Sequence, residues 1–449
     1  MGAVGFGVAG CGSAHGPAPP HQQFRSRPDL KPPPVRILTP AHGTALGFVF
    51  LAPKKNVAQA GPMIVDDRGR LVWFRPLNTR GVTDFRVQTY RGRPVLTWWR
   101  GRPIHGEGDG NYAIVDSSYR PVARVRPGNG LVGDIHEFLI TPRDTALMTI
   151  FHRVRRGDRT IFEGALQELD IASGRILLEW HSLGHVALDE SYEQPPRKTS
   201  LPYDYFHVNS IDEDTDGNLL VSARNTHAVY KLDRRTGEIL WRLGGKRSDF
   251  TMGPGTRFAW QHDARRRPDG TITLFDNEAA PQVGPQSRGI VLRLDLRRMR
   301  ATLVRSLVHR PCLLAATQGN MQALPDGHYF VGWGARPYFT EYDAEGGVLF
   351  DARFGYRDDS YRAYRFRWIG RPRGRPAIAI SGRTAYVSWN GATEVAKWQL
   401  LDGDRRIGDA RKTGFETAIP IPPRVASVAV RALAHDGSVL GTSQSLPVP

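Results

Sequence analysis

Three histidines enter equivalent short strands in three successive repeats of the chain. They are His136, His207 and His262, and each lies seven to nine residues before an aspartate-containing turn. In the next repeat Asn320 takes the position. A neutral imidazole can act as a nucleophile, and imidazole nitrogens also exchange protons and hydrogen bonds. If the equivalent strands converge, the three rings face one cavity; alternatively, each histidine hydrogen-bonds a turn of its own repeat.

Two further polar residues accompany the second histidine. Asn209 lies two residues beyond His207, so both side chains point to the same face of a strand. Arg224 interrupts the apolar strand that follows the turn at 216–217, and a guanidinium in such a strand usually needs an anionic partner. An arginine together with several imidazole donors is suited to bind a sulfate or phosphate group.

The same imidazoles could instead bind zinc or copper. Glu137 and Asp263 directly follow two of the histidines, and adjacent residues of a strand point to opposite faces. No carboxylate therefore has the spacing of a metal ligand, and we predict a site with no metal and no cofactor.

A repeated pair of strands carries these residues. An apolar strand that ends in Asp, a turn and a second strand recur six times, with marker aspartates at Asp66, Asp116, Asp170, Asp233, Asp295 and Asp343. The markers are 48 to 63 residues apart, which suits propeller blades with long loops. No segment keeps a helical period over a helical length, so the prediction is an all-β protein with a six-bladed β-propeller.

The strand pattern divides the chain into three parts. Residues 1–34 form a signal remnant and a Pro-rich tether, which we expect to be disordered from about residue 12. The β-propeller is expected over residues 35–362. Short alternating strands over residues 363–449 predict a small C-terminal β-sandwich, similar to a fibronectin type III domain, to which we assign no chemistry.

The two cysteines lie in different settings. The sequence before Cys11 resembles the lipobox of bacterial lipoproteins, which predicts an exported, extracellular or cell-envelope lipoprotein with a lipid anchor at Cys11. No Lys or Arg precedes it and the apolar stretch is shorter than a full secretory signal, as expected for a translation start annotated too far downstream. Cys312 lies in an apolar run and is expected to be a buried thiol.

Composition excludes several classes of protein. The chain of 449 residues has a formal net charge of +17, but its arginines are spread among turns and no nucleic-acid-binding module is recognisable, so no nucleic-acid partner is predicted. Two cysteines exclude a disulfide scaffold. No apolar run is long enough for a transmembrane helix.

Five short motifs contain the polar residues described above. They occur in the order DIHEF (134–138), DYFHVNSI (204–211), SARN (222–225), QHDAR (261–265) and LFDN (274–277). Together they resemble the motifs of the bacterial aryl sulfotransferases, which transfer sulfuryl groups between phenols without the nucleotide sulfate donor PAPS. The resemblance extends over roughly residues 47–354 and is closer to the ASST-like branch of actinobacteria and fungi.

The resemblance implies a six-bladed propeller whose central channel holds the site, and a ping-pong mechanism through a sulfohistidine. His262 matches the position of the nucleophile. The positions that hold the sulfuryl oxygens are matched by His136, His207, Asn209 and Arg224, and the repeat position of Asn320 suggests a further substrate contact. The expected partners are an aryl sulfate donor and a phenolic acceptor. The chain departs from the family's periplasmic members, which carry their β-sandwich at the N-terminus.

Two other functions fit part of the pattern. One is a non-catalytic extracellular propeller that binds a protein or a polysaccharide. The other is a quinone-dependent dehydrogenase-like propeller, because residues 232–241 resemble a quinoprotein repeat; only residues 172–180 approach a second copy.

Overall fold

The computed structural model describes residues 19–104, 106–355 and 357–449, and within them nearly all regular structure is β-strand. The only helix of these residues is the 3₁₀ turn η1 (Leu188–Glu190). None of the described helices is long and apolar enough to cross a membrane. The prediction of an all-β protein is confirmed. Cys11, the expected lipidation site, lies outside the described residues.

Six sheets with a core of four antiparallel strands follow one another along the chain; in five of them the four strands are successive, and the first sheet takes one strand from the end of the region. The first three, in hydrogen-bonded order, are β27 (Tyr364–Phe366), β2 (Phe48–Leu51), β3 (Met63–Val65) and β4 (Leu71–Phe74); β5 (Gly81–Tyr90), β6 (Arg93–Ile104), β7 (Glu107–Val115) and β8 (Pro121–Val125); and β9 (Phe138–Ile140), β10 (Thr145–Arg156), β11 (Arg159–Asp170) and β12 (Ile176–His181).

The remaining three sheets continue the pattern. They are β14 (Val208–Glu213), β15 (Leu219–Ala223), β16 (Ala228–Leu232) and β17 (Ile239–Gly244); β19 (His262–Arg266), β20 (Ile272–Asp276), β21 (Arg288–Asp295) and β22 (Arg300–Leu307); and β23 (Asn320–Ala323), β24 (Tyr329–Gly332), β25 (Tyr338–Tyr342) and β26 (Val348–Arg353). Three added strands lie beside them: β1 (Arg36–Thr39) on β26, β13 (Tyr203–Asp204) on β11, and β18 (Thr251–Met252) on β22.

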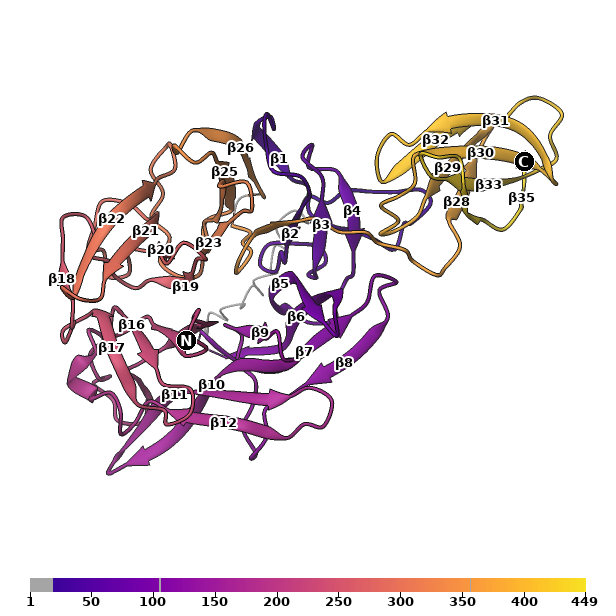
Figure 1. Cartoon of the computed structure of the whole chain (residues 1–449). Helices are drawn as coiled ribbons and strands as arrows, with labels where there is room; N and C mark the ends of the chain where they lie inside the picture. The colour runs from indigo at the N-terminus through magenta and orange to yellow at the C-terminus, as the bar shows by residue number, and fades with distance from the viewer. Residues whose placement is uncertain (1–18, 105, 356) are drawn as a thin grey trace, which may run out of the picture.

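The six sheets form a closed ring, as Figure 1 shows. Each apolar cluster within this region is built from two successive sheets, and one cluster joins the sixth sheet back to the first. Burial of both faces of every sheet against its neighbours is the main favourable contribution to such a fold. The starting strands of the sheets lie toward the common centre, where polar residues at their ends meet.

The ring is closed by strands from both ends of this region. β27 pairs antiparallel with β2, with Phe366 opposite Phe48, and β1 pairs with β26. The ring sheets therefore extend through Phe366, beyond the expected boundary at residue 362. β27 has only three residues, too few to show a strand period in the sequence, so the sequence alone does not reveal that the ring continues beyond residue 362.

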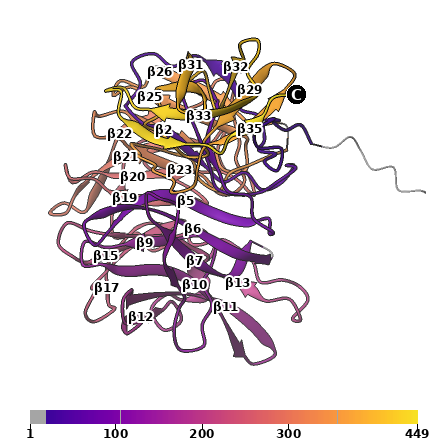
Figure 2. The ribbon, with the colours of Figure 1, turned by 90° about the vertical axis from the view of Figure 1, so that its right-hand side faces the viewer.

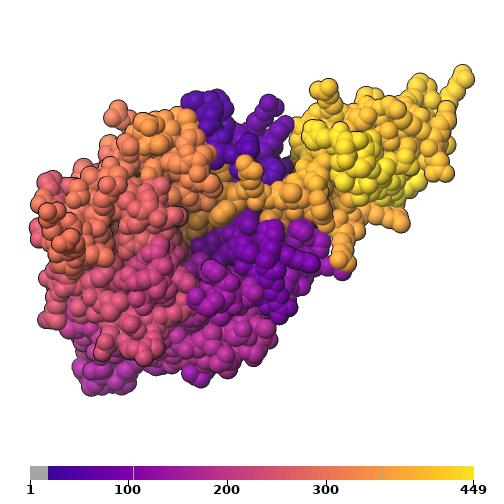
Figure 3. All heavy atoms as spheres, viewed as in Figure 1, coloured from indigo at the N-terminus to yellow at the C-terminus, as the bar shows by residue number. Residues whose placement is uncertain are grey.

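The C-terminal residues form two sheets around one apolar core. One contains β28 (Ala377–Ser381), β29 (Thr384–Ser388) and β32 (Glu416–Pro420); the other contains β31 (Arg405–Arg411), β30 (Lys397–Asp402), β33 (Ser427–Leu433) and β34 (Val439–Thr442), with β35 (Leu446–Pro447) on β33. In Figure 1 they lie beside the ring, in Figure 2 they are on the side that faces the viewer, and Figure 3 shows them as a projecting lobe. Asn390 attaches this lobe to the first sheet by two hydrogen bonds with the backbone of Phe74.

Two expectations for the loops and the N-terminal segment are wrong in the described part of the chain. Residues 19–34 are packed rather than disordered: Leu30 is 1% exposed, and the Ser26 hydroxyl lies 2.7 Å from that of Ser388 in the lobe. Prolines in this segment reduce the conformational entropy lost on ordering. Cys312 is exposed, because its apolar run forms a loop between β22 and β23 instead of a strand.

Buried charges of both signs meet at the centre of the ring. We call this set the central ion network; its members are Asp84, Arg86, Glu137, Asp263, Arg265 and Arg362. Arg362 Nη1 lies 2.8 Å from Asp84 Oδ1, and its Nη2 lies 3.2 Å from Glu137 Oε2. The carboxylate of Glu137 also pairs with Arg86 and Arg265.

The charges of the central ion network balance, with three guanidinium groups facing three carboxylates. Burial alone would raise the pKa of Glu137, but Arg265, Arg362 and Arg86 together hold this pKa below its ordinary value. Arg362 Nη2 also donates to the backbone oxygen of Asn209 at 3.0 Å, which extends the network to the fourth sheet. The network therefore connects sheets that are far apart in sequence.

Removal of one member of this network leaves a buried charge without its partner. Arg362→Met is expected to lower the free energy of unfolding by about 3–5 kcal/mol. The measurement is urea unfolding followed by tryptophan fluorescence. Arg126→Met, which removes an exposed arginine, serves as the control and should change stability by less than about 0.5 kcal/mol. Equal stability of the two variants would show that the network contributes nothing.

Candidate active site

A cavity of about 400 Å³ opens at the centre of the ring, and residues from successive sheets and their loops line it. Four of the six predicted site residues are among them: His136, His207, Arg224 and His262. The rings of His136 and His207 lie edge to face with 4.9 Å between their centroids. Tyr361 lies between the histidines, 5.6 Å from the ring of His136 and 6.4 Å from that of His262.

The backbone alternation of the central strands separates the cavity from the central ion network. His136 and His262 face the cavity, whereas the next residues, Glu137 and Asp263, belong to the network. Tyr361 and Arg362 divide in the same way. Beyond the network, Asp263, Arg86 and Arg265 line a second, larger cavity of about 710 Å³. The network thus lies directly behind residues that line the smaller cavity, between the two cavities.

His262 is held in one tautomer by its surroundings. Its Nδ1 lies 2.8 Å from Asn277 Oδ1 and 3.1 Å from the backbone oxygen of Trp260, and both atoms can only accept hydrogen bonds. Nδ1 must therefore carry the proton. Nε2 accepts a hydrogen bond from the backbone N–H of Gln318 at 3.2 Å. The lone pair of His262 is consequently at Nε2. It faces Gln318, which also lines the cavity.

Burial keeps His262 uncharged. The side chain is 1% exposed, and this burial lowers its pKa well below the ordinary value of 6.5; nearby Arg224 lowers the pKa further. The hydrogen bond with Asn277 acts in the opposite direction but does not outweigh burial. At neutral pH the ring is therefore a neutral imidazole, and its Nε2 electron pair, which accepts the Gln318 N–H, becomes available for attack when that hydrogen bond is released.

Asn277 is a site residue to which sequence reasoning gave no role. It follows β20, and its Nδ2 donates to the backbone oxygens of Ala315 and Gln318 at 2.9 Å each. These two bonds turn its Oδ1 toward His262. The signal was present in the LFDN motif, but the sequence does not show which side chain that asparagine contacts.

The other two histidines are paired with carboxylates. His136 Nδ1 bonds to Asp134, and His207 Nδ1 bonds to Asp204. Asp134 is fixed in turn by the backbone N–H of Gly108 at 3.0 Å. Burial lowers the pKa of His136, and the Asp134 carboxylate partly opposes this effect. Both aspartates begin motifs recognised in the sequence, DIHEF and DYFHVNSI, but the sequence alone assigns them no role.

Arg224 lies in the cavity wall without a carboxylate at ion-pair distance in the described part of the chain. Its guanidinium stacks over the Trp260 ring at 4.6 Å, and Nη1 donates to Asn225 Oδ1 at 2.7 Å. Nε is buried and has no hydrogen-bond partner among the described residues. Burial lowers the pKa of Arg224, an effect that the distant carboxylates of Asp204 and Glu193 only partly oppose. A buried guanidinium without a carboxylate partner is stabilised when an anion binds to it.

The two predicted asparagines do not reach the cavity lining. Asn209 is fully buried, and its Nδ2 donates to the backbone oxygen of Gln261 at 2.7 Å. Asn320 exchanges two hydrogen bonds with the backbone of Ala363, at 2.8 and 2.9 Å. Both side chains connect neighbouring sheets. The repeat correctly places Asn320 at the start of a central strand. It does not show that the Asn320 side chain turns to the backbone of Ala363 instead of the cavity.

The ring of sheets and the central cavity define an all-β protein with a candidate active site lined by three histidines and an arginine. Residues 86–355 match the family model described as "Arylsulfotransferase (ASST)". The chain belongs to the arylsulfotransferase family, which confirms the resemblance at family level and supports sulfotransferase-type activity. His136, His207, Arg224 and His262 all lie within the matched residues.

Solved structures with a similar arrangement are distant in sequence. A protein of unknown function from Bacteroides caccae is 13% identical, with a TM-score of 0.44 over 72% of this chain and 100% of that chain. An inactive variant of virginiamycin B lyase from Staphylococcus aureus, with quinupristin, is 10% identical, with a TM-score of 0.37 over 80% and 96% of the two chains. A luciferin-regenerating enzyme is 12% identical, with a TM-score of 0.37 over 75% and 99%. A search of the curated proteins gave no match.

The contact between Asn277 and His262 generates a prediction about the tautomer. In the native protein His262 should be protonated at Nδ1, and Asn277→Ala should move it toward a mixture with the Nε2–H form because the better-aligned acceptor is lost. The measurement is long-range ¹H–¹⁵N correlation NMR of ¹⁵N-histidine-labelled protein. Asn78→Ala, at an exposed asparagine, is the control and should leave the His262 signals unchanged. A native His262 that carries its proton at Nε2 would contradict the assignment.

Proposed function

We propose that this protein transfers a sulfuryl group from an aryl sulfate ester to a phenolic acceptor through a sulfohistidine at His262. The observation that carries the proposal is the convergence of one neutral histidine, two carboxylate-paired histidines and an arginine without a carboxylate partner on one cavity. Membership of the arylsulfotransferase family supports the same reaction class.

His262 has the properties that a nucleophile toward sulfur requires. Its neutral ring has an electron pair at Nε2, and the proton at Nδ1 is held by Asn277 and Trp260. When Nε2 attacks sulfur, the ring acquires positive charge, which the Asn277 oxygen can stabilise through the Nδ1–H bond. The attacking atom requires no prior deprotonation, in contrast to a serine or a cysteine.

In the first half-reaction the Nε2–S bond forms as the bond between sulfur and the ester oxygen breaks. The aryl oxygen leaves as a phenolate with the electron pair of that bond, in the cavity lined by His136 and His207, and is then protonated by solvent. The products are a free phenol and a sulfuryl group on His262.

In the second half-reaction a phenol oxygen attacks the sulfur, and the bond from sulfur to Nε2 breaks. The phenolic proton passes to solvent, which restores the starting enzyme and balances the proton taken up in the first half-reaction. Because donor and acceptor use one cavity in turn, the kinetics are expected to be ping-pong. No metal or organic cofactor takes part in this scheme.

Arg224 is proposed to bind the sulfuryl oxygens. It lines the same cavity as His262, and its guanidinium has a donor that no described protein group uses. Charge on the sulfuryl oxygens would therefore meet a fixed cation in a partly dehydrated site, where such interactions are strongest.

The proposal extends to the rest of the chain. We propose that the six ring sheets are the blades of a six-bladed β-propeller over residues 35–366, and that the C-terminal lobe is a fibronectin type III-like sandwich. Asn209 and Asn320 are proposed to position the site through the backbone rather than to contact substrate. An exported lipoprotein anchored at Cys11, and membership of the ASST-like branch of actinobacteria and fungi, remain predictions from the sequence.

The test is the formation of the covalent intermediate. Incubation of the purified protein with 4-nitrophenyl sulfate and no acceptor should add the mass of one sulfuryl group, and peptide mapping should place it on His262. His262→Ala should form no adduct and should lower kcat by about 10⁴-fold or more with a phenol acceptor. Intact-mass spectrometry and release of 4-nitrophenol measure the two results.

The control for this experiment is His42→Ala, at an exposed histidine outside the cavity, which should form the adduct normally. An adduct that persists in His262→Ala would remove His262 from the nucleophile role. Absence of both adduct and turnover across a panel of aryl sulfates would favour a binding function instead.

A second prediction concerns the arginine. Arg224→Met keeps much of the side-chain volume but removes the charge, so kcat should fall by about 10²- to 10³-fold because the sulfuryl oxygens lose their cation. Steady-state release of 4-nitrophenol is the measurement, and Arg126→Met is the matched control. Unchanged kcat with a raised KM would show that Arg224 binds substrate and transition state equally.

A further inference from the structure

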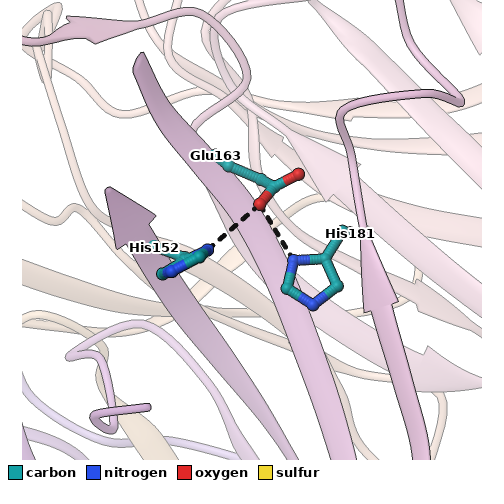
Figure 4. A group of neighbouring side chains, drawn as sticks. All are labelled: His152, Glu163 and His181. Atoms are coloured by element: carbon teal, nitrogen blue, oxygen red, sulfur yellow. Dashed lines mark hydrogen bonds and ion pairs between the residues drawn. The ribbon is translucent and has the colours of Figure 1, made fainter. Parts of the chain in front are cut away.

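A second group of ionisable side chains lies on the third sheet, outside the central cavity. It consists of His152 on β10, Glu163 on β11 and His181 on β12, as Figure 4 shows. His152 Nδ1 lies 3.2 Å from Glu163 Oε2, and His181 Nδ1 lies 2.9 Å from the same oxygen. One ligand atom from each residue lies within 4.8 Å of those of the other two. We call these three residues the sheet-3 cluster.

The register of the third sheet places the cluster on one face. His152 is directly opposite Glu163 in the β10–β11 ladder. His181 is opposite Ala165, two residues along β11 from Glu163, so its side chain is on the same face. The small side chain of Ala165 leaves the His181 ring room to lean toward Glu163. Three neighbouring strands of one ladder therefore fix the spacing of the three donors.

The cluster faces away from the residues proposed to act in catalysis. Phe151, which precedes His152 on β10, packs against the rings of His136 and His207 at 5.4 and 5.2 Å. Adjacent residues of a strand point to opposite faces, so His152 points away from the central cavity. The side chains of His152 and His181 are 41% and 31% exposed, whereas Glu163 is 6% exposed. The group is open to solvent from one side.

A fourth residue orients His181. Glu179 Oε1 lies 2.9 Å from His181 Nε2, and its other oxygen accepts hydrogen bonds from Gln167 at 2.6 Å and from Asn129 at 2.8 Å. Both nitrogens of His181 face carboxylate oxygens, so both donate: Nδ1–H to Glu163 and Nε2–H to Glu179. A metal ion at Nδ1 would replace the proton donated to Glu163, while Nε2–H would stay on Glu179. A carboxylate behind the ring of a ligating histidine is a common arrangement in zinc sites, because it fixes the tautomer and increases the basicity of the ligand.

We propose that His152, Glu163 and His181 bind a divalent transition-metal ion, with zinc as the ion that the donor set favours. Two imidazole nitrogens and one carboxylate oxygen match its preference for nitrogen and oxygen ligands, and the exposed side leaves a fourth position for water. Bond lengths of about 2.0–2.2 Å place tetrahedral ligands roughly 3.3–3.5 Å apart, so the donor pairs at 3.2 and 2.9 Å would have to move apart by at most about 0.6 Å to hold the ion.

The bound ion would connect three strands of one sheet. β10 and β11 form the long hairpin Thr145–Arg156 and Arg159–Asp170, and β13 pairs with the same part of β11 near the cavity, with Asp204 opposite Phe162. A metal at Glu163 would therefore stiffen the strand that supports the segment of His207. The site is independent of the proposed reaction, since none of its ligands lines the central cavity.

The test is zinc binding by the full-length chain without an affinity tag, after dialysis against a chelator. Isothermal titration with zinc chloride should give one site per chain, and cobalt(II) in place of zinc should give the strong visible absorbance of a tetrahedral site. His152→Gln, at a half-exposed position that does not endanger folding, should weaken zinc binding at least about tenfold. Glu179→Gln should weaken it by about 10- to 100-fold without removing a ligand.

The control is His42→Gln, which removes an exposed histidine elsewhere and should bind zinc as the native chain does. Zinc should also raise the melting temperature of the native chain and of His42→Gln, but not that of His152→Gln. The proposal is overturned if the native chain binds no zinc at this site, or if His152→Gln and Glu179→Gln bind it with unchanged affinity. In that case the cluster is a hydrogen-bonded group that only joins three strands.

Discussion

The central ion network is the constraint on which the rest of the structure depends. Sheets that meet at a common centre bring their polar ends into a region without bulk water, where an unpaired charge would be costly. Asp84, Glu137 and Asp263 are matched there by three arginines, and Arg362, from the segment that closes the ring, contacts several of the other sheets. The network both links the closing segment to the other sheets and lies directly behind residues that line the cavity.

The cavity and the network are built from neighbouring residues of the chain. Four of the six network residues directly follow a residue that lines the cavity, so the order of residues that buries Glu137 and Asp263 also presents His136 and His262. In each of these pairs, one residue contributes to the buried ion network and its neighbour in the chain lines the cavity. The partner of each histidine differs: an amide oxygen accepts the Nδ1 proton of buried His262, whereas Nδ1 of His136 and Nδ1 of His207 each bond to a carboxylate.

In the third sheet, the two faces of strand β10 contribute to two different sites. Phe151 packs against the site histidines, and His152 beside it belongs to the sheet-3 cluster on the opposite face. The cluster was invisible to sequence reasoning because its residues are 11 and 18 positions apart and belong to three strands, without any of the spacings typical of metal motifs. Only the register of the β-ladders, with His152 opposite Glu163, brings them together.

The sequence alone determined the all-β class, the repeat, and the three histidines and arginine that line the cavity, because these depend on local period and on residue type at equivalent positions. It also predicted that Glu137 and Asp263 turn away from the histidines. The sequence did not reveal the contacts of Asn277, the inward packing of residues 19–34, the exposed position of Cys312 or the direction of the Asn209 and Asn320 side chains. Those were decided only by tertiary structure, since each depends on a backbone or side-chain partner that comes from another sheet or loop.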